Sequence, residues 1–477
     1  FVETPSVTWK VMQMQPVARG QLDGPWVGSL KLRLAGNRVD GGLAERVIKF
    51  RCRITGIHDK TPEEDGWLAS CTAFRAQYAS GKTRLMADIT EQTGIGVEVH
   101  QIPWLSYQDQ VFLNFGNKQT DFDIVIGDSQ WIGRGATKGL YLELTDWLPG
   151  AVDMQTIHPR AARYLCEYPP GSSKFFAAPC ETDAIGFVYR KDWFEDPDEK
   201  AAFKTKYGRE LMVPETWEEF RDIAEFFQRP AQKRYGCSLL TGRGYDSIVM
   251  GFQPFLWAWG GAWGDPETFK VQGHLNSAGA VAGLDFFKGL MHFTPEGGTN
   301  ADYFFNLEAF SNGSTAMVLD YFPFYPGIVA AMGDQAGFFK VPSHNGQRFI
   351  SLGGQGFSIS TKTTPEKQAL AKQFIAWFSQ TEIQKKWITY PGSFTANTEL
   401  LSSEAFAAAS PYNTTFAESL DDLQDFWNVP VYNELIAASV RHLGAALDGT
   451  VASAAALNAL AEEHEMIMME AGLLEMK

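Results

Sequence analysis

The segment FFAAPCETDAIGFVYRKDWF, residues 175–194, is a long extended run that decides the domain organisation of this chain. Its apolar residues continue on both sides of one polar triplet, Glu181, Thr182 and Asp183. A nearly continuous apolar strand is typical of burial on both faces, and long strands with a polar break often cross between domains. We therefore predict that the chain passes from one domain to the next at this triplet.

A second buried strand is predicted upstream, at residues 122–127, where FDIVIG leads directly to Asp128 and Ser129. Residues 107–115 show helical spacing, and residues 95–102 alternate like a strand, so the three segments read as part of a βαβ-like unit. Polar residues at the carboxyl end of such a strand lie where open α/β sheets bind ligands. Asp128 and Ser129 are therefore candidate ligand-binding residues.

The first half of this βαβ-like unit is predicted upstream, with residues 95–102 as its second strand. Residues 46–57 predict a strand, and apolar residues between Trp67 and Ile89 fall at helical spacing. Within residues 1–45, only the segment that begins at Trp26 alternates like a strand, and the sequence assigns this region no role.

Helix starts recur downstream. Thr216 with Glu219 forms a capping-box signature, and Ser277 and the Thr364-Pro365 pair precede further apolar periodic segments. Thr381 begins another, and the C-terminal region is also helical in pattern. Strands that alternate with helices in this way predict an α/β fold.

The stretch FLWAWGGAWGD, residues 255–265, places Trp257, Trp259 and Trp263 within seven residues, interrupted by glycines. The glycines argue against a long regular element, so we predict a loop lined with aromatic rings. A single tryptophan is more often a core residue, but three together favour an aromatic binding surface. We predict that Trp257 and Trp259 form the apolar wall of a ligand site and that Trp263 is structural.

Length and composition limit the class of protein. A chain of 477 residues exceeds what one hydrophobic core normally serves and predicts two domains. Apolar residues make up 45% and charged residues 20%, which excludes a disordered or fibrous chain. The net charge of −15 disfavours nucleic acid and anionic membranes as partners.

Processing and redox signals are few. No apolar run is long enough to span a bilayer, and the chain opens at Phe1 without a signal-peptide pattern, so we expect any leader to be absent from it. The five cysteines form no CxxC pair, so we expect neither a metal site nor a cofactor.

Separated motifs then resemble one known family in their order and spacing, over roughly residues 85–400. The resemblance is to the family 1 extracellular solute-binding proteins, the maltose-binding-protein-like subunits of ABC importers. The motifs are TGIGVEV with PWLSYQDQ at 93–110, DFDIVIGDS at 121–129, APCETDAIGFVYRKDWF at 178–194, PETWEEF at 214–220, LWAWGGAW at 256–263, AFSNGSTAMVLDY at 309–321 and SLGGQGFSIS at 351–360.

The resemblance implies a two-lobed α/β periplasmic-binding-protein fold, type II-like, with a ligand cleft between lobes joined by a hinge. Crossovers are expected near Glu181 to Asp183 and near Gly353 to Gly356, where glycines absorb backbone rotation. We expect lobe 1 to comprise residues 1–181 and about 355–395, with 1–45 as an atypical extension, and lobe 2 to comprise 182–354 and about 396–477.

By position, the resemblance also implies a set of ligand-binding residues. Each has a structural alternative: Asp128 could cap a helix, Asp320 could end a strand, and Glu181 could pair with an arginine. The implied residues are Asp128, Ser129, Glu181, Asp183, Trp257, Trp259, Asp320, Tyr321, Gly354 and Gln355.

The implied function is capture of a small hydroxylated solute, a carbohydrate or polyol, and its delivery to an ABC permease. We expect no catalysis, a single copy of the chain, and a periplasmic or extracellular location, either free or lipid-anchored. A glycosidase-like enzyme with an aromatic-lined cleft is the main alternative, because such enzymes also use aromatic platforms and paired carboxylates. A structural or adaptor protein is the third.

Three further motifs are weaker. SGKT at 80–83 lacks the first glycine of a phosphate loop, since position 76 is alanine. Gly354 and Gly356 resemble the start of a dinucleotide loop, but position 359 is isoleucine. His464 in EEHEMIMME could suggest a metal site, although packing on a helix explains it better.

Cys166 and Cys180 flank the turn-rich segment EYPPGSSKFFAAP. Their spacing, with the export that the resemblance implies, predicts a disulfide between them. The alternative is that both are buried thiols.

Overall fold

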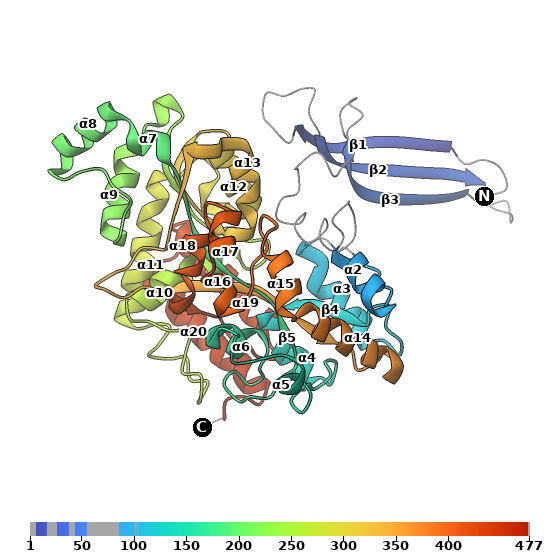
Figure 1. Ribbon diagram of the computed structural model, residues 1–477. Coiled ribbons are helices and arrows are strands. Elements are labelled where there is room, and N and C mark those ends of the chain that lie inside the picture. Colours follow the sequence, from blue (N-terminus) through green and yellow to red (C-terminus); the bar gives the residue numbers. More distant parts are fainter. Residues whose placement is uncertain are drawn as a thin grey trace. The chain divides into compact units, whose positions relative to one another are not determined.

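The structure is a computed structural model that describes residues 6–16, 26–37, 43–54, 85–100, 102 and 104–475. Two compact units divide the chain, Phe1–Trp67 and Leu68–Lys477, and each has its own sheet. The ribbon in Figure 1 labels the elements of both units.

The first unit is a three-stranded antiparallel sheet in the order β1-β2-β3. Its strands are β1 (Ser6–Pro16), β2 (Trp26–Asn37) and β3 (Leu43–Ile54). The strands predicted at Trp26 and at residues 46–57 are confirmed within the described residues. However, β3 pairs with β2 in this separate sheet and does not join the predicted βαβ-like unit.

The second unit begins, in its described part, with α2 (Leu85–Thr93) and α3 (Trp104–Gly116). These agree with the predicted helices, although residues 67–84 of the first helix lie outside the described residues. The predicted strand at 95–102 is wrong, because its described residues adopt no regular structure. Thr90 Oγ1 donates to Ile95 O at 2.8 Å, and Thr93 Oγ1 accepts from Ile95 N at 3.2 Å. The backbone N–H and C=O of Ile95 are therefore bonded to threonine side chains of α2, and not to a neighbouring strand.

The large sheet of the second unit has seven strands, with a main path in the order β10-β9-β5-β7-β6. In addition, β4 pairs with β9, and β8 pairs with β5. The strands are β4 (Ile124–Asp128), β5 (Ala178–Arg190), β6 (Tyr235–Ser238), β7 (Thr315–Tyr321), β8 (Ala336–Phe339), β9 (Ile350–Ile359) and β10 (Leu423–Gln424).

The long strands β5 and β9 run antiparallel and change partners midway. Glu181, Thr182 and Asp183 pair with Gln355, Gly354 and Gly353, respectively. Before this point β4 attaches to β9, and after it β7 and β8 attach to β5. The two segments predicted as crossovers therefore lie side by side, at the place where the pairing partners change. The lobe boundaries predicted from the sequence remain a proposal.

The helix starts predicted from the sequence are confirmed. The Thr216 side chain accepts from Glu219 N in a full capping box, Ser277 caps the next predicted helix, and the Thr364 side chain accepts from Lys367 N. The helices they begin, with the one that starts at Thr381, are α9 (Trp217–Phe227), α11 (Ala278–Leu290), α14 (Pro365–Phe378) and α15 (Thr381–Trp387).

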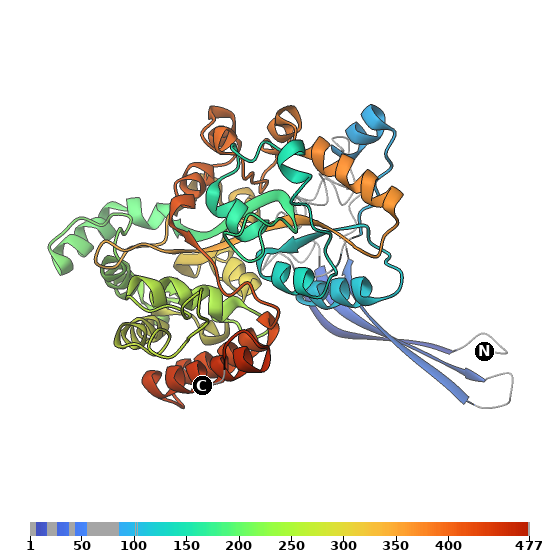
Figure 2. The ribbon, with the colours of Figure 1, turned by 90° about the horizontal axis from the view of Figure 1, so that it is seen from below.

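Helices cover both ends of the large sheet. Figures 1 and 2 show α19 and α20 beside α10 and α11, a packing that the contacts between these elements confirm. The remaining helices are α4 (Ile132–Thr137), α5 (Leu148–Ala151), α6 (Pro159–Leu165), α7 (Lys191–Glu195), α8 (Pro197–Tyr207), α10 (Ser247–Ala258), α12 (Tyr303–Ser311), α13 (Pro326–Met332), α16 (Thr398–Leu401), α17 (Glu404–Ala409), α18 (Asn413–Ala417), α19 (Tyr432–Leu447) and α20 (Ser453–Glu470).

The predicted aromatic loop at 255–265 is partly wrong, because residues 255–258 complete α10. All twelve residues of this helix are buried, so the apolar run packs on every side, and Trp257 lies within the helix. The helix ends at the glycines: Trp259 is the C-cap, and Gly260 has φ 83°.

The predicted disulfide does not form, and Cys166 and Cys180 are buried thiols. The chain does reverse between them, but Phe176 N and Ala177 N both donate to Cys166 O, at 2.8 and 3.2 Å. Cys180 is three residues beyond Ala177, which an extended strand covers in about 10 Å, whereas a disulfide needs Cα atoms about 4–7 Å apart. The register of the turn therefore separates the two residues.

We expect Gly354→Ala to weaken the paired crossovers. Gly354 has φ +104°, and a Cβ at this position would lie 2.6 Å from Glu181 O. Backbone strain of this kind costs about 1–3 kcal/mol, which urea unfolding would measure. Gly289→Ala in α11 is the matched control, because a Cβ there meets nothing within 4 Å. Equal stabilities for the two variants would contradict the account.

Candidate functional site

Asp128 and Ser129 lie at the carboxyl end of β4, where the sequence placed them. Asp128 is 8% exposed, pairs with Gln355 of β9, and accepts a hydrogen bond from Ser129 Oγ at 3.1 Å. It makes no side-chain cap to the short helix that follows, so the capping alternative is not the one observed. Burial, followed by the nearby Asp425 and Asp246 carboxylates, raises the pKa of Asp128 to about 8.

Glu181 and Asp183 are buried on β5, opposite Gln355 and Gly353 of β9. Burial raises the pKa of Glu181 to about 8 and the pKa of Asp183 well above its usual value. Asp183 Oδ1 accepts from Ala184 N at 2.6 Å. Neither carboxylate has an ion-pair partner in the described part of the chain, so the proposed pairing of Glu181 with an arginine is not observed there.

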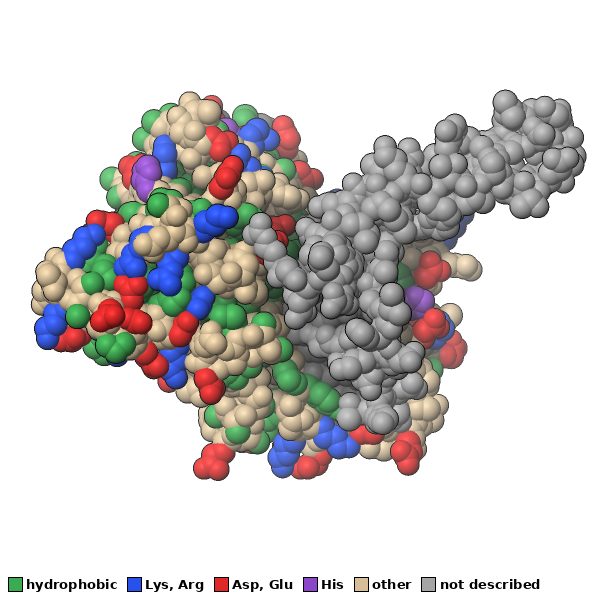
Figure 3. Space-filling view, turned by 90° about the horizontal axis from the view of Figure 1, so that it is seen from above, with side chains coloured by type: hydrophobic (Ala, Val, Ile, Leu, Met, Phe, Trp, Pro, Cys, Tyr) green, Lys and Arg blue, Asp and Glu red, His purple; other side chains and the backbone are tan. Residues whose placement is uncertain are grey.

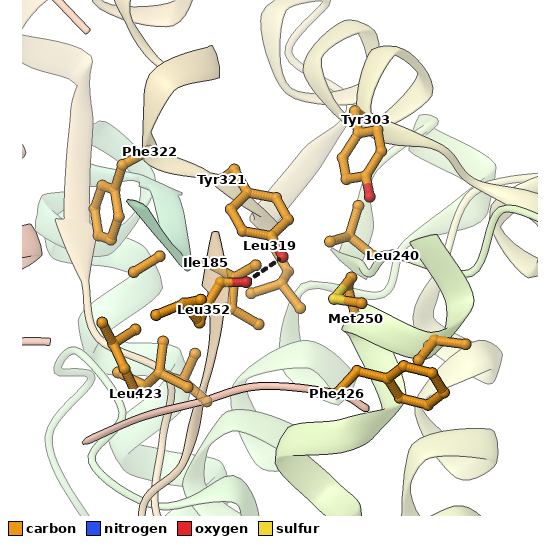
Figure 4. Packing of buried hydrophobic residues seen from close by; sticks show 14 of the residues in the cluster. Ile185, Leu240, Met250, Tyr303, Leu319, Tyr321, Phe322, Leu352, Leu423 and Phe426 are labelled. Carbon is orange, nitrogen blue, oxygen red and sulfur yellow. Dashed lines mark hydrogen bonds between the residues drawn. The ribbon is translucent and has the colours of Figure 1, made fainter. Parts of the chain in front are cut away.

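Asp320 and Tyr321 are the last two residues of β7. Asp320 Oδ1 accepts from Tyr321 N at 2.8 Å, while Asp320 Oδ2 is buried without a hydrogen-bond partner. Tyr321 Oη donates to Leu352 O at 3.0 Å, the bond drawn in Figure 4 beside the apolar side chains that surround it. This bond fastens the end of β7 to β9.

A group of polar and aromatic side chains from both ends of the sheet meets beside these residues. Trp131, just after β4, donates from Nε1 to Tyr245 Oη at 3.3 Å, and Tyr245 precedes α10. Tyr303 Oη donates to Asp246 Oδ1 at 2.7 Å. We name as the junction cluster Asp128, Asp246, Asp425, Trp131, Tyr245, Tyr303, Tyr321 and Tyr432.

The segment after β10 completes this cluster. Gln130 Nε2 donates to Asp425 Oδ1 at 3.1 Å, and Gly133 N donates to Asn428 Oδ1 at 2.7 Å. The strand β10 runs parallel to β9 at Ile350. Side chains that follow β4, precede α10 and follow β10 are therefore held together by direct hydrogen bonds.

The ionisable groups that dominate the junction cluster are carboxyl groups, which raise one another's pKa. Burial raises the pKa of Asp246 and the pKa of Asp425 to about 6 each. Asp425 also raises the pKa values of Asp246 and Asp128, so the three carboxylates repel one another. Their arrangement suits a ligand that donates hydrogen bonds.

The tryptophans from the 255–265 stretch lie elsewhere in their described contacts. Trp257 is 4% exposed, with its ring centroid 6.2 Å from that of Phe349. Trp259 stacks on His344 at 3.8 Å, and Trp263 donates to Gln253 Oε1 at 3.2 Å. None of these contacts reaches the junction cluster. The ligand-wall role of Trp257 and Trp259 stays a prediction, and their surroundings favour packing.

The other motifs from the sequence have structural surroundings where they are described. Gly354 and Gly356 lie within strand β9, not in a turn before a helix, and the segment 80–83 lies outside the described residues. His464 is fully buried beside Leu435 O, at 3.0 Å, and burial lowers its pKa to about 4. It fills the α19–α20 interface.

Several junction residues were not found from the sequence. Trp131 had a usable signal, because it follows Asp128 and Ser129 directly at the end of a predicted strand. Tyr245 and Asp246 precede an apolar helix, a position that also fits an ordinary helix start. Asp425 and Tyr432 carry no local signal, since only tertiary packing brings them to β4.

Comparison with known proteins identifies the class. The model for the family described as bacterial extracellular solute-binding protein matches residues 76–385, and the chain belongs to this family. Maltose-bound MalE3 of T. maritima is 23% identical, with coverage of 83% of this chain and 96% of that chain and a TM-score of 0.69. A ribitol complex from Agrobacterium radiobacter K84 is 23% identical, with coverage of 80% and 94% and a TM-score of 0.67.

A third similar structure is a solute-binding protein from Thermotoga lettingae bound to α-D-tagatose, 17% identical, with coverage of 84% and 97% and a TM-score of 0.70. These likenesses confirm the predicted two-lobed α/β fold of maltose-binding-protein-like proteins. Among the described residues, no helix combines the length and the apolar character needed to cross a membrane.

We expect stability to fall as the pH rises from about 4 to 8. Over this range the folded protein retains protons on Asp128, Asp246 and Asp425 that the unfolded chain, with ordinary carboxyl pKa values, has lost. Asp128→Asn removes one such group. It should reduce the fall in unfolding free energy between the two pH values by about 1 kcal/mol or more. Urea unfolding at pH 5.5 and 8.0 measures this effect.

The control for this measurement is Glu296→Gln, at an exposed position. It should leave the dependence of the unfolding free energy on pH as it is in the parent protein. If Asp128→Asn behaves like the control, the side chain of Asp128 is solvated and not held in the buried cluster.

Proposed function

We propose that this chain is the substrate-binding subunit of an ABC transporter, which captures a carbohydrate or polyol between its lobes and delivers it to a membrane permease. One observation carries the proposal: polar and aromatic side chains from both ends of the β5–β9 pair meet in the junction cluster. The solved structures with this fold hold maltose, ribitol and tagatose, which supports the ligand class.

The chemistry of the cluster also supports a hydroxylated ligand. Hydroxyl groups both donate and accept, so they suit carboxylates such as Asp128 beside amides such as Asn428. The faces of Trp131 and Tyr245 can exclude water from the C–H surface of a sugar or polyol. In this role the chain binds its solute and breaks no bond. We infer that it acts as a monomer outside the cytoplasm, in the periplasm or at the cell surface, free or lipid-anchored.

The first test is a thermal-shift screen with maltose, ribitol, D-mannitol and D-tagatose, extended to amino acids and oligopeptides. A ligand present at 100 times its Kd stabilises the folded state by about 2.7 kcal/mol. Binding without turnover supports the proposal. Hydrolysis of a glycoside would instead support the enzyme alternative, and binding confined to peptides would contradict the ligand class.

Closure on the ligand is a second expected outcome. Because β5 and β9 change partners at Asp183 and Gly353, rotation there would bring the lobes together around a bound solute. Small-angle X-ray scattering should show a smaller radius of gyration for the protein saturated with the best ligand from the screen. An unchanged radius of gyration would argue against closure. The ligand-free Gly354→Ala protein is measured in parallel.

The aromatic wall can be tested with two matched variants. Tyr245→Ala removes a ring that is half-buried in the junction cluster, and should weaken binding about thirtyfold with little loss of stability. Trp259→Ala removes the ring stacked on His344, and should lower the unfolding free energy by about 3 kcal/mol with unchanged affinity. Calorimetric titration and urea unfolding separate the two results, and the reverse pattern would favour the wall predicted from the sequence.

A further inference from the structure

The junction cluster contains three buried carboxyl groups for which the described protein surroundings supply no counter-charge. Asp128, Asp246 and Asp425 are 8, 4 and 7% exposed. None of them forms an ion pair with a lysine, arginine or histidine in the described part of the chain. The Arg160 side chain donates its hydrogen bond to Leu423 O and not to the carboxylate of Asp425. Buried carboxylates without a counter-charge are costly to keep ionised.

The hydrogen bonds within the cluster leave acceptors unused. Ser129, Tyr303 and Gln130 donate side-chain hydrogen bonds to these carboxylates. Asp425 Oδ2 and Gln130 Oε1 are nevertheless buried without a hydrogen-bond partner. Both atoms can only accept, and Asp425 and Gln130 are bonded to each other through their remaining polar atoms. A group that binds there must therefore donate hydrogen bonds.

Aromatic rings lie beside these carboxylates of the junction cluster. Trp131 is bonded to Tyr245, whose ring centroid is 6.5 Å from that of Tyr432. Burial, followed by Tyr245, Asp246 and Asp128, raises the pKa of Tyr432, so its hydroxyl stays neutral beside these carboxylates. Neutral aromatic faces next to carboxylates attract cations.

A single metal ion does not account for this pattern. In the part of the chain that the structure describes, no three carboxylate, histidine or cysteine side chains converge closely enough to hold one. An ammonium group differs from a metal ion because it is larger, donates three hydrogen bonds and needs no convergent ligands. It can reach Asp425 and Gln130 while its charge acts on the other carboxylates.

We propose that the junction cluster binds the protonated amine of a polyhydroxylated ligand, an amino sugar or amino polyol. This inference rests on the proposed function and names the ligand class more narrowly. The amine lies against Asp425 and Gln130, near Asp246 and Asp128. The ligand's hydroxyl groups meet Asn428 Nδ2, a donor that is buried without an acceptor, while Asn428 Oδ1 accepts from Gly133 N.

Matched pairs of ligands test the proposal. The probes are D-glucitol with 1-amino-1-deoxy-D-glucitol, D-glucose with D-glucosamine, and D-galactose with D-galactosamine, titrated by calorimetry at pH 7 and low salt. N-acetyl-D-glucosamine, a neutral amide, and D-glucuronate, an anion, complete the series. We expect the amine of at least one pair to bind about thirtyfold more tightly than its neutral parent. The amide should bind like the parent, and the anion should not bind.

Two isosteric variants locate the charge. Asp425→Asn and Asp246→Asn keep the shape of each side chain, and should reduce the preference for the amine over its neutral parent by about tenfold or more. Asp421→Asn, at an exposed position close in sequence, is the control and should leave the preference intact. Urea unfolding of each variant reports independently that it is folded.

The outcomes separate this inference from the proposed function. If the neutral parent binds as tightly as its amine, or if both variants leave the preference unchanged, the inference is wrong and the proposed function stands. If no sugar, polyol or amine in the series binds, both are contradicted. A preference for the anion would overturn the inference and would place a basic group in the site.

Discussion

The antiparallel pairing of β5 with β9 is the interaction on which the rest of the second unit depends. At one end β4 adds to β9, and at the other β7 and β8 add to β5, so two groups of strands share one pair. Away from the change of partners, each strand is fixed by its neighbours in the sheet. In the closure that we propose, rotation of one end against the other would be absorbed near Asp183 and Gly354, where φ of +104° suits glycine alone.

The same pairing explains why carboxylates gather at one level of the molecule. The strands β4 and β7 both end at the crossover, the first with Asp128 and the second with Asp320 and Tyr321. Strand ends in open α/β sheets carry irregular backbone and free polar groups, which is where such folds bind ligands. The N-terminus of α10 and the segment after β10 then bring Asp246 and Asp425 to this place. The junction cluster therefore forms chiefly because the strand order brings these strand and helix ends together.

This origin determines what could be predicted from the sequence. Two local signals succeeded: the capping box at Thr216 and the buried strand before Asp128 each depend on neighbouring residues only. The alternation after Ile95 misled because threonine side chains of α2 took its backbone groups, and the tryptophan stretch misled because α10 is buried on all sides. Asp425 reaches β4 through long-range packing, which no local pattern encodes.

The position of negative charge distinguishes solubility from binding. On the face shown in Figure 3, acidic and basic side chains are interspersed over the described surface, where water screens them at little cost. The carboxylates of Asp128, Asp246 and Asp425 add nothing to solubility, because they are buried, and they lower the stability of the free protein. Residues that oppose folding are expected at functional sites, where a partner restores what the fold loses. A ligand that donates hydrogen bonds or positive charge is the partner that suits this junction. If the ligand binds there as we propose, stability and affinity are linked: replacing a carboxylate by a neutral group stabilises the ligand-free protein and weakens ligand binding.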